Sequence, residues 1–131
     1  MSSDTPLWSP SRQQVDAAAI TQFIAAANKR FGLALTDYDD LHRWSVERRE
    51  DFWTLVWDEF GVIGDRGGVA IENGDAMPGA RFFPEARLNF AENLLRKTGS
   101  GDAIVFRGED KVERRLSWDE LRSLVSRLRA W

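Results

Sequence analysis

The chain of 131 residues contains no cysteine, which excludes a disulfide framework and any metal centre built on thiolates. Histidine is almost as scarce, since His42 is the only one. Transition-metal sites usually take three or four protein ligands, several of them His or Cys. The sequence therefore argues against a zinc-type site and is consistent with a reducing cytosol.

Neither sign of charge dominates, and no long apolar run is present. Eighteen basic residues stand against 21 acidic ones, for a net charge of −3. A basic surplus that would attract nucleic-acid phosphates is thus missing, as is a run long enough to cross a bilayer. Residues 1–11 lack the basic and apolar regions of a signal peptide. We expect a soluble cytoplasmic protein with neither nucleic acid nor membrane as a partner.

Hydrophobic residues are plentiful, at 43% of the chain, and aromatic residues reach 11%. In the N-terminal half they follow helical spacing. A capping box of Ser11 with Gln14 predicts one long helix over 11–31, ended by Gly32. Its apolar stripe consists of Val15, Ala19, Phe23, Ala26, Ala27 and Phe31.

Two further helices are predicted over 38–44 and 46–60. Asp37 is the expected N-cap of the first and Ser45 that of the second, which Gly61 ends. The second helix carries a broad aromatic face made of Phe52, Trp53, Val56, Trp57 and Phe60.

The C-terminal half changes character. Residues 61–81 are rich in glycine and predict an irregular connection with one short strand at 69–71. After an extended segment, Asn89 caps a helix, with Glu92 completing its capping box and Gly99 ending it. Alternation then predicts a hairpin of strands 103–106 and 112–116, with its turn at 108–111.

The last predicted helix starts at a capping box of Ser117 with Glu120. Its apolar stripe, which runs on to Trp131 without a stop signal, consists of Leu121, Leu124, Val125 and Leu128. We expect the chain to continue in its natural context. The predicted fold class is α+β: a mostly helical segment with one late β-hairpin.

One histidine and several carboxylates suggest a site near residue 42. Asp39 lies three residues before His42 on the same helical face, but a surface imidazole paired with Asp39 is favoured over a metal site. Ser45 could join His42 in a nucleophilic site, yet its spacing suits an N-cap better. Asp39 and Asp40 point about 100° apart on a helix, so a solvated face is favoured over a proton-sharing pair.

Two other features raise the possibility of a binding site. Glycine-rich turns such as Gly64–Gly68 can cradle anions, but no Gly-Lys-Ser/Thr ending and no obvious helix follow. A flexible turn is therefore favoured. The aromatic face of helix 46–60 is interpreted as packing, either against this chain's own helices or against a missing part of the protein.

The motifs carry a resemblance. Residues 33–61, with Tyr38-Asp39-Asp40-Leu41, Trp44-Ser45-Val46-Glu47 and Asp51-Phe52-Trp53, closely resemble the N-terminal region of acetoacetyl-CoA synthetases. Residues 81–95 resemble that family's Leu-Asn-(Tyr/Phe)-Ala-Glu-Asn-Leu-Leu signature, although Glu85 stands where the family often has glycine. Residues 103–128 resemble the hairpin and helix that open the large adenylation domain, and residues 7–11 fit the family's start.

The resemblance implies the N-terminal part of an ATP-dependent acid–thiol ligase of the adenylate-forming superfamily. Acetoacetate would attack ATP to give acyl-AMP and diphosphate, and coenzyme A would displace AMP, with Mg²⁺ accompanying ATP. Residues 1–99 would form a helical N-terminal cap and residues 100–131 the beginning of the adenylation domain.

The family's phosphate loop, ribose-binding acid and C-terminal lysine have no matching positions here. No catalytic, cofactor-binding or metal-binding residue is therefore assigned, and no bound cofactor is expected on these 131 residues, which we expect to be inactive alone. The remainder of the same polypeptide is the expected partner. The alternative is a free-standing helical module that binds a protein through its aromatic face.

Overall fold

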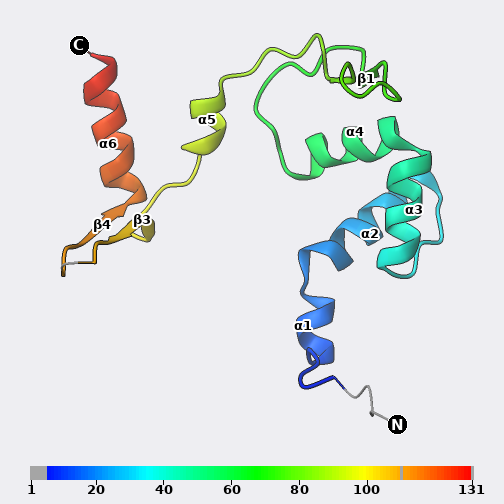
Figure 1. Cartoon of the computed structure of the whole chain (residues 1–131), viewed down its shortest axis with the longest axis horizontal. Helices are drawn as coiled ribbons and strands as arrows, with labels where there is room; N and C mark the ends of the chain where they lie inside the picture. The colour runs from blue at the N-terminus through cyan, green and yellow to red at the C-terminus, as the bar shows by residue number, and fades with distance from the viewer. Residues whose placement is uncertain (1–5, 110, 131) are drawn as a thin grey trace. The chain divides into compact units, whose positions relative to one another are not determined.

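The computed structural model describes residues 6–109 and 111–130 (Figure 1). Two compact units are present. Unit 1 comprises the chain up to residue 62 together with residues 66–86, and unit 2 comprises residues 63–65 and the chain from residue 87 onward. The structure is 45% helical with two small antiparallel sheets, which confirms the predicted α+β class. No helix in the described ranges is long and apolar enough to cross a membrane.

The first predicted helix is two helices in the structure. The Ser11–Gln14 capping box is confirmed and starts α1 (Arg12–Asp16), but Ala18 adopts an extended conformation, and α2 (Ala19–Phe31) follows. The hydroxyl of Thr21 donates to the carbonyl of Val15 at 2.7 Å, and the backbone N–H of Ala18 donates to the same carbonyl at 3.1 Å, so the break leaves this acceptor satisfied. No residue of α1 is buried, so packing does not hold the two parts in one helix.

The ends of the next helices were predicted only in part. Asp37 caps α3 (Tyr38–Glu47) by accepting from the backbone N–H of Asp40 at 2.9 Å, as expected. The prediction that Ser45 caps the following helix is wrong, because α3 continues past Ser45 and α4 (Arg49–Glu59) starts only after Arg48. At its end Gly61 adopts φ +58°, as a helix-ending glycine should.

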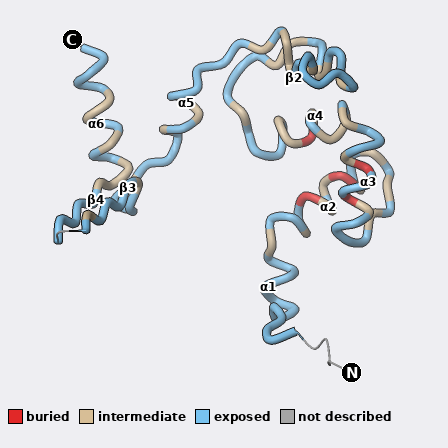
Figure 2. The backbone as a smooth tube through the Cα atoms, viewed as in Figure 1, coloured by how far each residue is buried: buried red, intermediate tan, exposed pale blue. Residues whose placement is uncertain are grey.

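The core of unit 1 forms where α2, α3 and α4 meet. Its buried side chains are Phe23, Ala27, Leu41, Trp44 and Leu55, and Figure 2 shows the buried positions confined to these three helices. The loop between α2 and α3 is fixed by the amide of Asn28, which both donates to and accepts from the backbone of Leu35, at 2.9 and 2.8 Å. Unit 1 is therefore a small but closed helical core.

A small sheet of two strands, each two residues long, follows α4. The sequence did not predict this sheet. Strand β1 (Ile71–Glu72) pairs antiparallel with β2 (Arg81–Phe82). The predicted strand at 69–71 overlaps β1 only at Ile71, and β2 lies in the segment that was predicted to be merely extended. The ladder gains one further bond, since the N–H of Phe83 donates to the carbonyl of Ala70 at 2.8 Å.

Unit 2 begins with a short helix. Asn89 caps α5 (Phe90–Leu94) by accepting from the N–H of Glu92, but the helix ends at Leu95 rather than at Gly99. The side chain of Asn93 connects α5 to a backbone segment 30 residues earlier. Its amide accepts from the N–H of Ile63 and donates to the C=O of Ile63, both at 2.8 Å.

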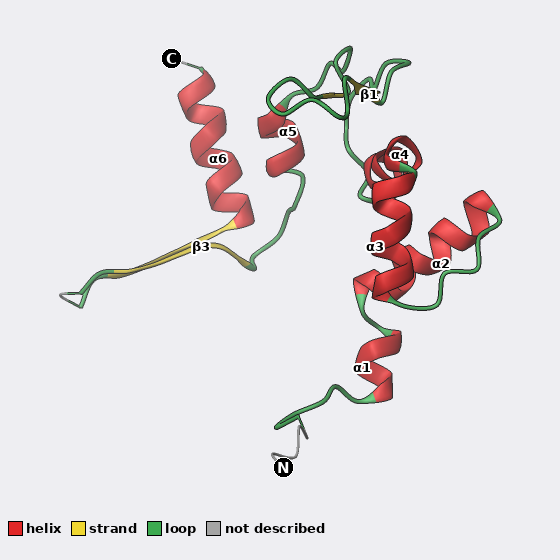
Figure 3. Ribbon diagram, turned by 45° about the vertical axis from the view of Figure 1, so that its right-hand side comes forward, coloured by secondary structure: helices red, strands yellow, loops and turns green. Residues whose placement is uncertain are grey.

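The predicted hairpin and final helix are both present (Figure 3). Strand β3 (Asp102–Arg107) pairs antiparallel with β4 (Glu113–Ser117), and Ser117 with Glu120 forms the capping box of α6 (Trp118–Arg129). Part of the predicted turn, at Asp110, and Trp131 at the end of the predicted stripe lie outside the described residues.

Candidate functional site

The region around His42 on α3 does not form a catalytic or metal cluster. The His42 side chain is exposed and stacks on the ring of Tyr38, with centroids 6.1 Å apart and planes 20° apart. The expected pairing with Asp39 does not occur among the ion pairs of the described residues. Tyr38, one turn before His42, lies on the same helical face, and the imidazole contacts its ring instead of the carboxylate of Asp39.

The hydroxyl of Ser45 is also engaged in a hydrogen bond within its own helix. Its hydroxyl donates to the carbonyl of His42 at 2.7 Å, the back-bonding common for serine inside a helix. The hydroxyl therefore does not face the imidazole ring as a nucleophile would.

Asp40 has a structural role rather than being a fully solvated carboxylate. Its Oδ2 accepts from the backbone N–H of Thr36 at 3.1 Å and from the Thr36 hydroxyl at 2.9 Å, while Oδ1 lies 3.3 Å from Arg43 Nη1. The hydrogen bonds from Thr36, backbone first, lower the pKa of Asp40, and Arg43 adds to this. The group thus stays ionised and fixes the chain entering α3, which makes it a poor proton donor.

The glycine-rich turn at 64–68 already holds an anion, the carboxylate of Glu85. Oε2 of Glu85 accepts from the N–H of Gly68 at 2.8 Å. Gly67 has φ +74°, and a Cβ there would stand 2.6 Å from that of Glu85. The turn is thus fitted closely to this side chain, and within unit 1 a short ladder rather than a helix follows it. A phosphate cradle of the P-loop type does not fit these residues.

The aromatic face of α4 is partly covered by unit 1 itself. The ring of Trp53 packs edge-on against Phe82 with centroids 5.3 Å apart, and that of Trp57 lies 4.9 Å from Phe83. Phe83 adopts φ +46°, a conformation rare for a bulky residue, so its contacts hold a strained backbone. Phe52 packs inward against Phe23. The interpretation of this face as packing within the chain is confirmed for Phe52, Trp53 and Trp57, although Trp53 remains 37% and Phe60 53% exposed.

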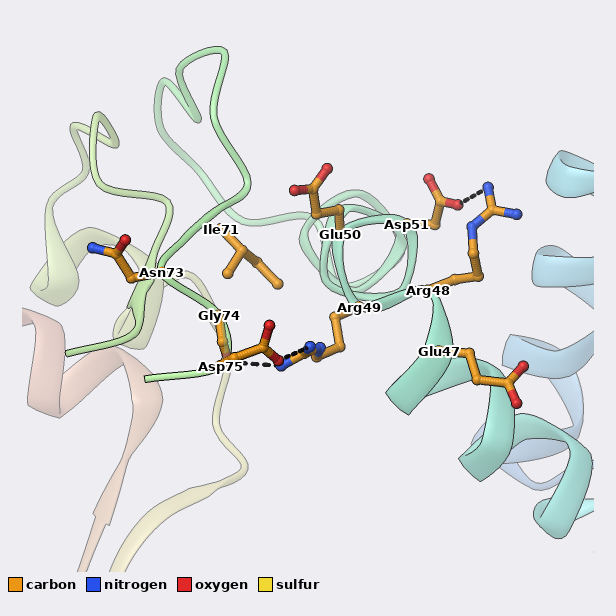
Figure 4. A pocket seen from close by; sticks show the side chains of 9 residues that line it. All are labelled: Glu47, Arg48, Arg49, Glu50, Asp51, Ile71, Asn73, Gly74 and Asp75. Carbon is orange, nitrogen blue, oxygen red and sulfur yellow. Dashed lines mark hydrogen bonds and ion pairs between the residues drawn. The ribbon is translucent and has the colours of Figure 1, made fainter. Parts of the chain in front are cut away.

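One open cleft, of about 510 Å³, lies between the start of α4 and the turn after β1 (Figure 4). Its lining is mainly polar and includes Arg49, Gly74 and Asp75. These three residues form a contact that the sequence did not reveal. The guanidinium of Arg49 donates from Nη1 to the carbonyl of Gly74 at 2.6 Å and from Nη2 to Oδ1 of Asp75 at 2.5 Å. The hydrogen bond and charge of Arg49 lower the pKa of Asp75.

The polar groups of the cleft hold the turn after β1 in place and do not form a catalytic or metal-binding arrangement. Arg48, the neighbouring cation and the N-cap residue of α4, is paired with Asp51 of that helix, 2.5 Å away. In the described part of the chain, no group of three or more His, Asp or Glu residues is arranged to hold a metal ion. The only sequence signal for the Arg49 contact was the turn-forming Asn73-Gly74-Asp75, which does not say where its acceptors point.

The chain is similar to the N-terminal parts of several coenzyme A synthetases. Residues 38–94 match the family model described as the acetyl-coenzyme A synthetase N-terminus. An acetoacetyl-coenzyme A synthetase of Rhizobium meliloti (strain 1021) is 59% identical over 98% of this chain and 20% of its own length. A malonamoyl-CoA synthetase of Penicillium aethiopicum is 37% identical over 80% of this chain and 16% of its own length.

The solved structures add a likeness in three dimensions. An acetoacetyl-CoA synthetase from Streptomyces lividans matches with a TM-score of 0.78 and 37% identity, over 96% of this chain and 21% of that chain. The chain thus spans about a fifth of the length of the curated relatives it matches.

Proposed function

We propose that this chain is the N-terminal part of an ATP-dependent acetoacetate–CoA ligase and a member of the acetoacetyl-CoA synthetase family. The observation that carries the proposal is the 59% identity to the Rhizobium meliloti enzyme over 98% of the chain. Since the relatives are about five times longer, the activity is proposed for the longer polypeptide and not for these residues alone.

The proposed reaction joins acetoacetate to coenzyme A in two steps. A carboxylate oxygen of acetoacetate attacks the α-phosphorus of ATP and diphosphate leaves. The sulfur of coenzyme A then attacks the acyl carbonyl carbon, and AMP leaves with the electron pair of the broken bond. Mg²⁺ would accompany ATP.

No step is assigned to residues of this chain, because the glycine-rich turn at 64–68 already binds the carboxylate of Glu85. We place the catalytic, cofactor-binding and metal-binding groups in polypeptide beyond this segment. Residues 1–99 are proposed as a helical N-terminal cap and residues 100–131 as the beginning of the adenylation domain. A cytoplasmic role in lipid and ketone-body metabolism is part of the same proposal.

The alternative of a free-standing protein-interaction module has no observation in its favour. It required an open aromatic face on α4, and that face packs on Phe82 and Phe83. The choice of acid is a separate question, because one relative is named for malonamoyl-CoA.

The test is a chimera in which this chain replaces the matching segment of the Rhizobium meliloti enzyme. We expect acetoacetyl-CoA formation and acetoacetate-dependent exchange of diphosphate into ATP. The 131-residue chain alone should show neither activity. Turnover by that chain alone, or a folded chimera that shows neither activity, would contradict the proposal.

A variant of the same chimera tests whether α3 takes part in the chemistry. His42→Ala should leave turnover unchanged, since the imidazole only stacks on Tyr38. A loss of about 100-fold or more, the scale of a missing general acid or base, would place His42 in the active site.

A further inference from the structure

Asparagine occurs four times in the chain, and one of the four differs from the others in its surroundings. The side-chain amides of Asn28, Asn89 and Asn93 are held by hydrogen bonds to backbone atoms. Among the described residues, the side chain of Asn73 has no hydrogen-bond partner. Asn73 is exposed, and Figure 4 shows its side chain pointing away from the Arg49 guanidinium. Its amide is therefore available for reaction.

The residue after Asn73 removes a steric barrier to such a reaction. Asn73 is the only asparagine that is followed by glycine. Because Gly74 has no Cβ, its backbone nitrogen can approach the preceding side chain unhindered. The carbonyl of Asn73 accepts from the N–H of Ala76 at 2.8 Å, so residues 73–76 form a turn, in which Asn73 adopts φ +53°. Asparagine tolerates this left-handed conformation better than most residues.

The backbone nitrogen of Gly74 lies next to a positive charge. Arg49 donates to the carbonyl of Gly74 at 2.6 Å, and a Cβ built on Gly74 would stand 3.5 Å from Arg49 Nη1. The N–H of Gly74 donates no hydrogen bond within the described ranges. A nearby cation favours the anionic form of a group, although the pairing of Arg49 with Asp75 offsets part of this charge. The missing Cβ is thus the main factor and Arg49 a secondary one.

We propose that Asn73 is a deamidation site, at which the chain converts its own asparagine to aspartate and isoaspartate. The backbone nitrogen of Gly74 gives its proton to water or hydroxide and attacks Cγ of Asn73. The Cγ–Nδ2 bond breaks, and ammonia leaves with the electron pair of that bond and a proton from solvent. A five-membered succinimide ring remains. Nucleophile and electrophile belong to adjacent residues, so the step is intramolecular.

Water completes the reaction by opening the ring at either of its carbonyl carbons. Attack at Cγ restores the normal main chain and gives aspartate. Attack at the main-chain carbonyl carbon leaves the peptide link through Cγ and gives isoaspartate. Overall, one water is consumed and one ammonia is released. Asn73 and Gly74 both line the open cleft of about 510 Å³, so water can enter and ammonia can leave.

The products alter the turn that Arg49 holds. Isoaspartate routes the main chain through its β-carbon, which adds one atom to the backbone just before the Gly74 carbonyl that Arg49 binds. Either product also adds a carboxylate between Glu72 and Asp75 in the sequence, where like charges repel. Strands β1 and β2 have only two residues each, so they provide little further restraint. We therefore expect deamidation to release the turn after β1.

Peptide mass spectrometry tests the site after incubation of the 131-residue chain in mildly alkaline buffer. The peptide containing Asn73 should gain the mass of an amide-to-acid conversion about tenfold faster than those containing Asn28, Asn89 or Asn93, a barrier difference of about 1.4 kcal/mol. An isoaspartate-specific carboxyl methyltransferase with labelled S-adenosylmethionine should label only the Asn73 peptide. Equal conversion at all four asparagines, or no isoaspartate at residue 73, would overturn the proposal.

A matched pair of substitutions tests the role of the missing Cβ. In Gly74→Ala the added Cβ stands 3.0 Å from Cγ2 of Ile71, which a small shift relieves, and conversion at Asn73 should slow by about tenfold or more. Gly68→Ala adds the same group in another turn, 3.6 Å from Glu85 Oε2, and should leave the rate unchanged. Equal rates in the two variants would overturn the mechanism.

Two further measurements do not depend on the folding of Gly74→Ala. Asn73→Gln lengthens the side chain so that a five-membered ring cannot form, and the isoaspartate label at residue 73 should disappear. In the incubated wild-type chain, the amides of residues 71–76 should exchange faster in the modified fraction, while those of α2 to α4 stay protected. Equal exchange of residues 71–76 in both fractions would contradict the release of the turn. None of these readouts requires ligase activity, so this proposal and the proposed function fail separately.

Discussion

Arg49 and Asp75 are 26 residues apart in the sequence, and their side chains meet 2.5 Å apart, between Nη2 and Oδ1. The same guanidinium also binds the carbonyl of Gly74. Two bonds from one planar group fix both position and orientation of the turn after β1. The first turn of α4 is thereby tied to the small sheet that covers its aromatic face.

Removing this tie should destabilise unit 1. Arg49→Met keeps much of the side-chain length but loses both hydrogen bonds, so the urea midpoint should fall and the amides of residues 71–76 should exchange faster. Arg48→Met is the matched control, because the side chain of Arg48, the N-cap residue of α4, pairs with Asp51 three residues along the chain. Exposed pairs of that type contribute little, so the control midpoint should hardly move.

The same contact predicts a pH dependence. Arg49 lowers the pKa of Asp75 below its ordinary value of 3.8, so the folded state holds the ionised form more strongly than the unfolded state does. The resulting stability is fully present above pH 3.8 and is lost as the pH falls through the lower folded pKa. Carboxyl NMR titration should show a midpoint for Asp75 below 3.8 that rises toward 3.8 in Arg49→Met. An unchanged midpoint in the variant would contradict the assignment.

The two candidate caps of the α3–α4 region should behave oppositely. Asp37→Ala removes the side chain that accepts from the N–H of Asp40, and should cost about 1 kcal/mol in the free energy of unfolding. Ser45→Ala, inside α3, should stay within about 0.5 kcal/mol, since alanine suits a helix interior. Urea unfolding followed by circular dichroism measures both. A larger loss for Ser45→Ala would restore it as a cap.

One chemical change at two positions tests the difference in burial. Leu55 is fully buried in the core of unit 1, whereas Leu128 on α6 is 76% exposed. Leu55→Ala should cost about 2–5 kcal/mol through lost burial and the cavity left behind. Leu128→Ala in the 131-residue chain should stay within about 0.5 kcal/mol. Similar losses at both positions would show that α6 is packed in the chain alone.

Local sequence signals predicted those features whose chemistry is local. The capping boxes at Ser11 and Ser117 and the caps at Asp37 and Asn89 are all present, because each depends on residues no more than three apart. The hairpin of β3 and β4 was predicted from alternation on both sides of a turn, a signal contained in one short stretch of sequence. Ser45 misled because its spacing suits a cap, while α3 continues through it and its hydroxyl bonds back to His42.

Long-range contacts could not be read from the sequence. Nothing local indicates that Glu85 caps the N–H of Gly68, that Phe83 packs on Trp57, or that Arg49 reaches the turn after β1. The break at Ala18 was missed because the apolar stripe was taken to continue through it. An apolar stripe stabilises a helix only where its side chains pack against other residues. Val15, at the start of that stripe, is 44% exposed.

The division of the core also sets an order of events during synthesis. Every buried side chain of unit 1, and the Phe82–Phe83 segment that covers α4, lies within the first 86 residues. Domains fold largely as units while the ribosome is still adding chain. Unit 1 can therefore close early on the emerging polypeptide, before β3, β4 and α6 have been synthesised.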